Sequence, residues 1–282
     1  MRAAFPAPPA AAKRWQAPLI IKASVACHLG VGVAAVASAM DWPWAAGVIA
    51  ANHAVLTLCG LWPRSTWLGQ NLLRLPAEAT QRGEVAITID DGPDPEVTSA
   101  VLDIFDAECA RATFFCIAAQ AKRHPALCRE IVRRGHSVQN HTERHSHTFS
   151  LLGPRSLVAE VGSAQAALAE ITGTRPAFFR APAGMRNPFL APVLQRLELQ
   201  LVSWTRRGYD TVQRRPMRVL QRLAGKLAAG DILLLHDGHA ARTCKGQPIV
   251  LAVLPALLRG LRLHGLHAVT LDHAMASRAG VA

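Results

Sequence analysis

Two long apolar stretches lie near the N-terminus. Residues 23–40 and residues 44–62 carry no Asp, Glu, Lys or Arg, and each is about as long as a helix must be to cross a bilayer. Tryptophans flank these stretches, as they do at membrane interfaces: Trp15, Trp42, Trp44, Trp62 and Trp67. We therefore expect residues 15–70 to form a two-helix transmembrane hairpin, in which small residues such as Gly30 and Gly47 allow close helix packing.

Other interpretations of the two stretches stay open. The first stretch could be a signal peptide, because Ala37-Ser38-Ala39 resembles a cleavage site. That interpretation leaves the second stretch unexplained. Both stretches could instead lie along the membrane interface, or they could be buried core helices.

Beyond the hairpin, short apolar runs alternate with amphipathic segments. Runs suited to strands occur at 85–90, 113–118, 136–141, 177–182, 199–205, 231–236 and 267–271. Apolar residues at helical spacing predict helices at 96–109, 155–171, 216–229 and 249–264. Strands that alternate with helices favour a parallel α/β fold.

We expect one catalytic domain over residues 85–275, joined to the hairpin by a polar linker at 71–84. Residues 1–14 and 276–282 are expected to be tails, the first of them disordered. Chemically active side chains follow the ends of predicted strands: Asp90, Asp91, His141, Arg180 and His236. That placement is typical of β/α barrels, although a doubly wound sheet stays possible.

The composition narrows the possible partners. A net charge of +12 favours attraction to an anionic surface, either membrane lipids or nucleic acid. Only one Trp and one Tyr lie beyond residue 70, so no nucleic acid partner is expected. Six cysteines without a CxxC pair favour a reducing compartment. No obligate protein partner is evident.

Basic residues flank the hairpin at both ends and predict its orientation. The first stretch is preceded by Arg2, Lys13, Arg14 and Lys22, and the second is followed by Arg64 and Arg74. The connecting turn carries only an aspartate, Asp41. By the positive-inside rule, we expect the catalytic domain on the cytoplasmic face of a bacterial inner membrane. A periplasmic domain is the alternative.

The stretch Thr88-Ile89-Asp90-Asp91-Gly92-Pro93 places two carboxylates at the end of a predicted strand. Adjacent side chains of a strand point to opposite faces, so the two carboxylates can serve different tasks beside one cavity. His141 and His145 follow further along the chain. A carboxylate with two imidazoles is a ligand set for a divalent metal with open positions, which suggests metal-assisted hydrolysis. Taken singly, the aspartates are more often a turn and the histidines a solvated helix face.

In combination these residues resemble the motifs of the polysaccharide deacetylases with a NodB homology domain, carbohydrate esterase family 4. The motifs are TIDDGP at 88–93, HTERH at 141–145, Arg180-Ala181-Pro182-Ala183-Gly184, Trp204 with Asp210, and an apolar run that ends in His236-Asp237. The resemblance covers roughly residues 82–275. It implies an α/β fold of the distorted (β/α)7 barrel type.

The resemblance implies roles for the metal site and the general base. Asp91, His141 and His145 would hold a divalent metal, most simply Zn²⁺, with Co²⁺, Mn²⁺, Ni²⁺ or Fe²⁺ as alternatives. Asp90 would be the general base, and Arg180 would orient its carboxylate.

The resemblance also implies roles on the substrate side. His236 would be the general acid, and Asp210 would hold its ring. The backbone N–H of Ala183 would bind the oxyanion, Leu234 would form the acyl pocket, and Trp204 would contact the substrate. The histidines outside these motifs, His239 among them, are assigned to structure or the surface.

The chain departs from the family pattern around the sugar groove. Ala183 and Thr211 replace usual aromatics, and Arg207 replaces a usual acid. Four basic residues could bind phosphate oxygens or form a solvated loop: Arg206, Arg207, Arg214 and Arg215. We expect a hydrolase that removes an N-acetyl group from an amino sugar of a polysaccharide or a lipid-linked glycan. The alternatives are an O-deacetylase or deformylase with the same site, and a catalytically silent membrane-bound glycan-binding protein.

Overall fold

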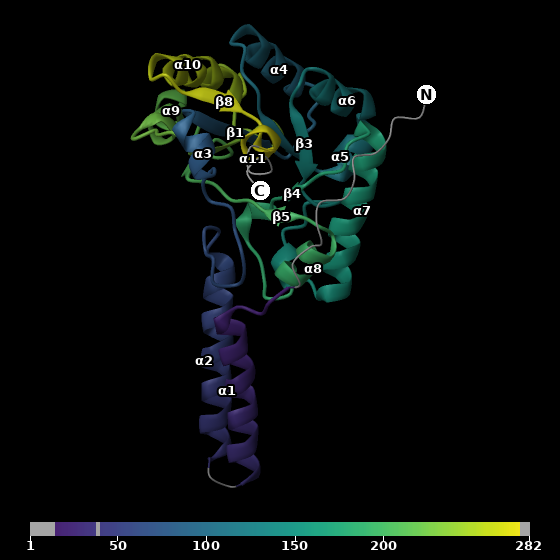
Figure 1. The fold of residues 1–282 in the computed structure, drawn as a ribbon, viewed down its shortest axis with the longest axis vertical. Coiled ribbons are helices and arrows are strands. Elements are labelled where there is room, and N and C mark those ends of the chain that lie inside the picture. The colour runs from purple at the N-terminus through teal and green to yellow at the C-terminus, as the bar shows by residue number, and fades with distance from the viewer. Residues whose placement is uncertain (1–14, 38–39, 277–282) are drawn as a thin grey trace.

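The computed structural model describes residues 15–37 and 40–276. The chain forms an α/β domain from which two long helices project side by side (Figure 1). The expected tails, except Ala276, and most of the suggested cleavage site at Ala37-Ser38-Ala39 lie outside the described residues.

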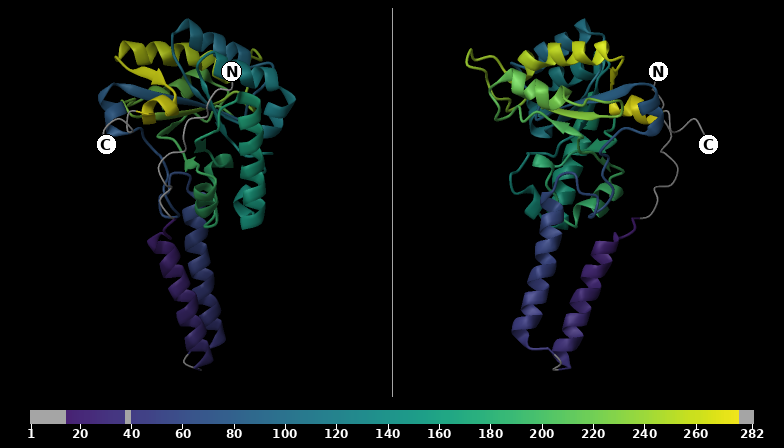
Figure 2. Two further views of the ribbon diagram at one scale, coloured as in Figure 1. Left: turned by 45° about the vertical axis from the view of Figure 1, so that its right-hand side comes forward. Right: turned by 90° about the vertical axis from the view of Figure 1, so that its left-hand side faces the viewer.

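The domain is built on one curled sheet of eight strands, all paired in parallel (Figures 1 and 2). The strand order is β5-β4-β3-β2-β1-β7-β6, with β8 beside β1. The strands are β1 (Glu84–Asp90), β2 (Thr113–Cys116), β3 (Ser137–Asn140), β4 (Phe178–Phe179), β5 (Gln200–Leu201), β6 (Arg206–Arg207), β7 (Ile232–His236) and β8 (His267–Val269). The expected distorted parallel α/β barrel is confirmed.

One short segment connects the two ends of this sheet. β5 pairs with β4 at one end, whereas β6 pairs with β7 at the other. Leu201 and Arg206 can be at most about 18 Å apart along an extended chain, so the two ends must approach each other. Of the strand expected at 199–205 only β5 forms, and β6, which was not expected, begins at the next residue, because the chain crosses between opposite ends of the sheet there.

Helices cover the outer side of the sheet (Figure 2). They are α4 (Thr98–Ala107), α5 (Ala118–Arg123), α6 (Pro125–Arg133), α7 (Pro154–Thr172), α8 (Leu190–Arg196), α9 (Pro216–Ala224) and α10 (Ile249–Leu263). The last helix, α11 (Leu271–Ala276), packs instead on the inner face, where Leu271 and Ala274 are buried in one cluster with Ala86. The four expected helices correspond to α4, α7, α9 and α10. The shorter helices were not expected, because each offers too few residues for a clear apolar period.

Strand β1 shows how the sheet separates the core from the site. Val85, Ile87 and Ile89 are buried in the main hydrophobic cluster, together with apolar residues of α4 and α10. The alternate residues Thr88 and Asp90 are also buried, but they point to the inner face of the sheet. The sequence alternation of β1 therefore directs polar groups into the barrel.

Two helices form at the N-terminal apolar stretches: α1 (Leu19–Val36) and α2 (Trp42–Leu61). Both are long and apolar enough to cross a membrane, and only 6% of each apolar window is buried. Between the helices, Asn52 Nδ2 donates a 2.9 Å hydrogen bond to Ser24 Oγ. Gly30 and Gly47 do not provide the expected close packing, because a Cβ at either position would meet nothing within 4 Å.

Residues 71–84, expected as a linker, pack against the domain. The N–H of Leu72 donates to Leu201, and its carbonyl oxygen accepts from Ser203, both at 2.9 Å. In α3 (Ala77–Gln81) the side chain of Ala79 is fully buried. This connection is part of the folded domain, and it fixes where the chain leaves α2.

The segment that follows α2 also contacts the domain closely. The N–H of Arg186 donates a 3.0 Å hydrogen bond to the carbonyl oxygen of Gly60, where any side chain would collide with the Arg186 backbone. The guanidinium of Arg186 donates to the carbonyl oxygen of Ser65. The C-terminal end of α2 is thereby attached to the loop that follows β4.

Candidate active site

Two carboxylates stand at the C-terminal end of β1, and glycines set their position. Asp90 ends the strand, and Asp91 turns the chain with a φ of 75°. A Cβ at Gly238, which follows β7, would lie 2.5 Å from the carbonyl oxygen of Asp91. A side chain at Gly92 would collide with the carboxylate of Asp237. The two strand ends can approach this closely only because both positions are glycine.

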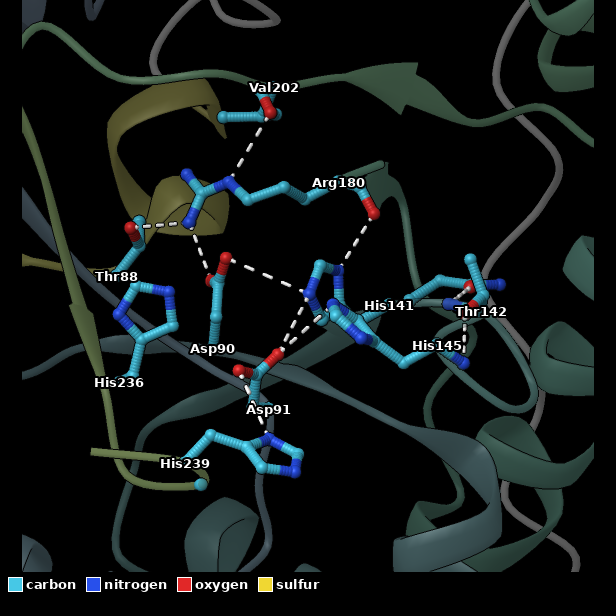
Figure 3. Close-up of polar contacts among 12 residues, drawn as sticks. Thr88, Asp90, Asp91, His141, Thr142, His145, Arg180, Val202, His236 and His239 are labelled. Atoms are coloured by element: carbon cyan, nitrogen blue, oxygen red, sulfur yellow. Dashed lines mark hydrogen bonds and ion pairs between the residues drawn. The ribbon is translucent and has the colours of Figure 1, made fainter. Parts of the chain in front are cut away.

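Asp91, His141 and His145 bring three potential ligand atoms together (Figure 3). Oδ1 of Asp91 lies 3.2 Å from Nε2 of His141 and 3.3 Å from Nε2 of His145. The histidines lie in the loop that follows β3, where φ values of 68° at Thr142 and 54° at His145 turn the chain. They are not on a helix; the loop aims both rings at Asp91.

The contacts of these three residues fit a cation between them. Nδ1 of His141 lies 2.8 Å from the carbonyl oxygen of Arg180, which can only accept, so Nδ1 carries the proton and Nε2 a lone pair. Oδ1 of Asp91 is buried and has no hydrogen-bond donor among the described residues. Burial, with the nearby His141, lowers the pKa of His145 to about 4, so that ring is neutral. Lone pairs that converge without a proton between them repel each other, and a bound cation would remove this repulsion. One carboxylate oxygen and two imidazole nitrogens are a ligand set that suits Zn²⁺.

His239 is a further imidazole at Asp91. Its Nδ1 lies 3.4 Å from Oδ2 of Asp91, and this contact raises the pKa of His239. Burial raises the pKa of Asp91, but its contacts with His141 and His239 outweigh burial and hold that pKa well below its usual range. We expected His239 in a structural or surface role; the ring is exposed, yet it belongs to the site. Its spacing of three residues after His236 was the available signal.

Arg180 holds the second carboxylate, Asp90. Nη1 of the guanidinium donates to Oδ1 of Asp90 at 2.6 Å and to Oγ1 of Thr88 at 2.7 Å. The other nitrogens donate to the carbonyl oxygens of Ser203 and Val202 at 3.0 and 3.3 Å (Figure 3 shows the Val202 bond). Arg180 is only 1% exposed. Asp90 therefore has a fixed orientation, and its Oδ2 is left to face the site.

His236 and Asp210 form a second oriented pair. Nδ1 of His236 lies 2.9 Å from Oδ1 of Asp210, whose Oδ2 accepts the backbone N–H of His236 at 2.7 Å. Burial alone would lower the pKa of His236, but the charge and the hydrogen bond of Asp210 outweigh it and raise this pKa to about 9. The ring lies beside Asp90 (Figure 3), so a protonated Nε2 is available to the site.

The expected substrate-contacting residues surround this centre. Leu234 precedes His236 by two residues on β7, so both side chains are on the inner face. Trp204 is 6% exposed, and its ring lies 5.8 Å from the Arg180 guanidinium. Ala183 adopts a φ of 53° in the loop that follows β4. Gly184 adjoins Trp204, because a Cβ there would lie 2.8 Å from its ring.

The four arginines expected as phosphate ligands have different environments. Arg206 is occupied: its Nε donates to Asp231 at 2.8 Å, and its other nitrogens donate to the carbonyl oxygens of Gly225 and Lys226. Arg214 donates to a backbone carbonyl oxygen at 3.1 Å. Arg207 is in register with Leu234 of β7, so its side chain points to the inner face of the sheet. Of the four arginines that could bind phosphate or form a solvated loop, Arg206 is therefore not available as a phosphate ligand.

Comparisons with known proteins agree with this geometry. A family model described as polysaccharide deacetylase matches residues 77–202. A chitooligosaccharide deacetylase of Azorhizobium caulinodans is 34% identical over 170 residues, which are 60% of this chain and 80% of that protein. A peptidoglycan-N-acetylglucosamine deacetylase of Bacillus cereus is 31% identical over 190 residues, which are 67% of this chain and 86% of that protein.

A solved structure extends the similarity to the fold. The family 4 carbohydrate esterase of Streptomyces lividans, in complex with acetate, aligns with a TM-score of 0.60 and 30% identity. The alignment covers 66% of this chain and 91% of that chain.

Proposed function

This chain belongs to the polysaccharide deacetylase family, and we propose that it is a divalent-metal-dependent hydrolase that removes an N-acetyl group from an amino sugar. One observation carries the proposal. Asp91, His141 and His145 converge beside a carboxylate held by Arg180 and an imidazole held by Asp210. The related deacetylases act on chitooligosaccharides and on peptidoglycan N-acetylglucosamine, so an N-acetylated glycan is the substrate class.

The metal site and the general base would prepare the attacking water. Asp91, His141 and His145 would hold the metal, which when bound polarises the acyl oxygen and makes a water more acidic. Oδ1 of Asp90 is occupied by Arg180 at 2.6 Å, so Oδ2 would accept the proton of the attacking water.

The remaining residues would bind the acyl group and complete the proton transfer. The backbone N–H of Ala183 would donate to the developing oxyanion, and Leu234 would contact the acetyl methyl group. Nε2 of His236 would then protonate the departing amine, while Asp210 stabilises the charged ring. A pKa of about 9 for His236 keeps this proton available at neutral pH.

We further propose that the enzyme is membrane-bound and that its glycan is lipid-linked. Two apolar helices with exposed side chains support the membrane location, and the flanking basic residues favour a cytoplasmic catalytic domain over a periplasmic one. The attachment of α2 to the loop after β4, which carries Ala183, supports a site close to the bilayer. A topology reporter fused after Ala282 tests the side: activity in the periplasm would contradict the cytoplasmic assignment.

The deacetylase proposal is tested on the full chain with wild type, Asp90→Asn and His141→Ala. Zinc content and acetate release from N-acetylated chitooligosaccharides are measured in parallel. We expect wild type to bind about one metal ion and release acetate, D90N to bind metal but lose about 10²–10⁴-fold in rate, and H141A to lose metal. A metal-loaded wild type that releases acetate only from O-acetylated sugars would support the O-deacetylase alternative. No metal binding would favour the silent glycan-binding protein.

A further inference from the structure

Arg207 lies on the inner face of the barrel, beside the residues proposed to bind the substrate. In β6 it is in register with Leu234 of β7. Paired residues of parallel strands present their side chains on the same face, and Leu234 shares that face with His236. Arg206, its neighbour, points to the outer face, where it pairs with Asp231. The side chain of Arg207 is thus on the side of the general acid.

Two aromatic rings hold the guanidinium of Arg207 in place. Its Cζ lies 5.4 Å from the ring centre of Trp204 and 5.1 Å from that of Tyr209. Tyr209 adopts a φ of 61°, which lets its neighbour Asp210 turn toward His236. Stacking on aromatic faces fixes the plane of the guanidinium, and a fixed plane is well suited to bidentate recognition of an oxyanion.

No anionic side chain satisfies this cation among the described residues. The side chain of Arg207 makes none of the hydrogen bonds or ion pairs found there, and its Nε is buried without an acceptor. The nearest carboxylate in sequence, Asp210, is occupied by His236 at 2.9 Å. By contrast, Arg206 and Arg180 both pair with buried carboxylates. A half-buried, oriented and unpaired cation is costly to keep unless it has a ligand.

The surroundings add positive charge without supplying an acceptor. Arg222 of α9 stacks on Tyr209, with its Cζ 5.0 Å from the ring centre. Arg180 also lies near Trp204, with its Cζ 5.8 Å from the centre of that ring. Arg180 is already engaged with Asp90, whereas Arg207 has no carboxylate partner in the part of the chain that the structure describes.

We propose that Arg207 binds a phosphoryl group carried by the sugar substrate, next to the amine that His236 protonates. The planar fork of a guanidinium matches two oxygens of a phosphate, and the absence of a competing carboxylate leaves both positions for the ligand. This inference rests on the proposed deacetylase function, since it identifies the substrate of the same site as a phosphorylated amino sugar.

The test compares kcat/KM for N-acetylglucosamine 1-phosphate with kcat/KM for N-acetylglucosamine, with N-acetylmuramic acid as a carboxylate-bearing substrate. We expect wild type to prefer the phosphorylated sugar, and R207Q to reduce the preference roughly tenfold or more. R207K keeps the charge without the fork and should restore part of it. R218Q, on the exposed face of α9, should keep the wild-type preference.

Ligand binding to a catalytically inactive variant tests the phosphate site separately from the deacetylase activity. In a D90N background, calorimetry with N-acetylglucosamine 1-phosphate should show affinity that R207Q reduces and R218Q retains. If D90N binds the phosphate but wild type never releases acetate, the deacetylase proposal fails and the phosphate site stands. The Arg207 assignment is overturned if wild type releases acetate without preferring the phosphorylated sugar, or if it prefers the carboxylate-bearing sugar. It is also overturned if R207Q keeps the wild-type preference for the phosphorylated sugar.

Discussion

The hydroxyl of Ser203 donates a 2.7 Å hydrogen bond to the carbonyl oxygen of Pro63. Pro63 lies just beyond α2, and the carbonyl oxygen of Ser203 accepts from Arg180 at 3.0 Å. Arg180 in turn holds Asp90 at 2.6 Å. The end of the hairpin is therefore connected to the proposed general base through two intervening residues. A segment that looks like a membrane anchor in the sequence is therefore linked by hydrogen bonds to the residues of the site.

We predict that S203A slows the reaction without preventing folding. The carbonyl oxygen of Pro63 also accepts from Asn71 at 3.0 Å, so it stays satisfied when the hydroxyl is removed. The loss of one hydrogen bond, about 1 kcal/mol, should loosen the segment between β5 and β6 that positions Arg180. We expect kcat to fall about threefold to tenfold, with metal content unchanged. Ser163→Ala is the matched control, because that hydroxyl only bonds within α7. Wild-type kcat in S203A would show that the hairpin does not position the base.

The motifs could be predicted from the sequence, because each places Asp, His or Arg, the residue types needed for metal binding and proton transfer, near the end of a predicted strand. Asp91, His141 and His145 meet as expected, since parallel strands carry their C-terminal ends to one side. The opposite faces of Arg206 and Arg207 could not be predicted, because both residues lie beyond the strand expected at 199–205, and β6 forms only through its pairing with β7. The attachment of Gly60 to Arg186 depends on a contact between distant segments that no local pattern encodes.

We predict that D210N shifts the alkaline limb of the pH profile. Asp210 raises the pKa of His236 from 6.5 to about 9, so the protonated acid persists until the pH rises through about 9. By the same linkage, the pair's contribution to stability is complete below pH 6.5 and is lost as the pH approaches 9. Without the charge of Asp210, burial lowers this pKa.

The measurement is kcat between pH 5 and 10 in wild type and D210N, with metal content checked at each pH. We expect D210N to lose activity already near neutral pH, whereas wild type declines only toward pH 9. Identical alkaline limbs in the two proteins would mean that His236 is not the group that donates the proton.

We predict that H239A weakens metal binding without abolishing it. His239 contacts Oδ2 of Asp91 at 3.4 Å, whereas Oδ1 is the oxygen that faces His141 and His145. Removal of a partner that orients a ligand costs about 10–100-fold in metal affinity. Titration of the metal-free protein with Zn²⁺ measures the effect. His147→Ala is the control, since its ring adjoins His145 at 6.3 Å but is not among those that contact Asp91. Equal affinity in H239A and wild type would assign His239 to the surface.

Gly238 allows the chain after β7 to lie close to the chain after β1. A Cβ at this position would lie 2.5 Å from the carbonyl oxygen of Asp91 and 2.8 Å from its Cβ. Backbone cannot move aside as a flexible side chain can, so G238A should destabilise the fold by about 1–3 kcal/mol and displace Asp91. Thermal unfolding and Zn²⁺ titration should both show the change.

The matched control for G238A is Gly260→Ala in α10, where a Cβ meets nothing within 4 Å. An alanine inside a helix should leave stability unchanged or raise it by up to about 1 kcal/mol. If G238A unfolds at the wild-type temperature and binds Zn²⁺ with wild-type affinity, the contact does not position Asp91. If G238A loses stability but keeps its zinc affinity, the glycine serves the fold alone, and the metal ligands are held by the loop that carries His141 and His145.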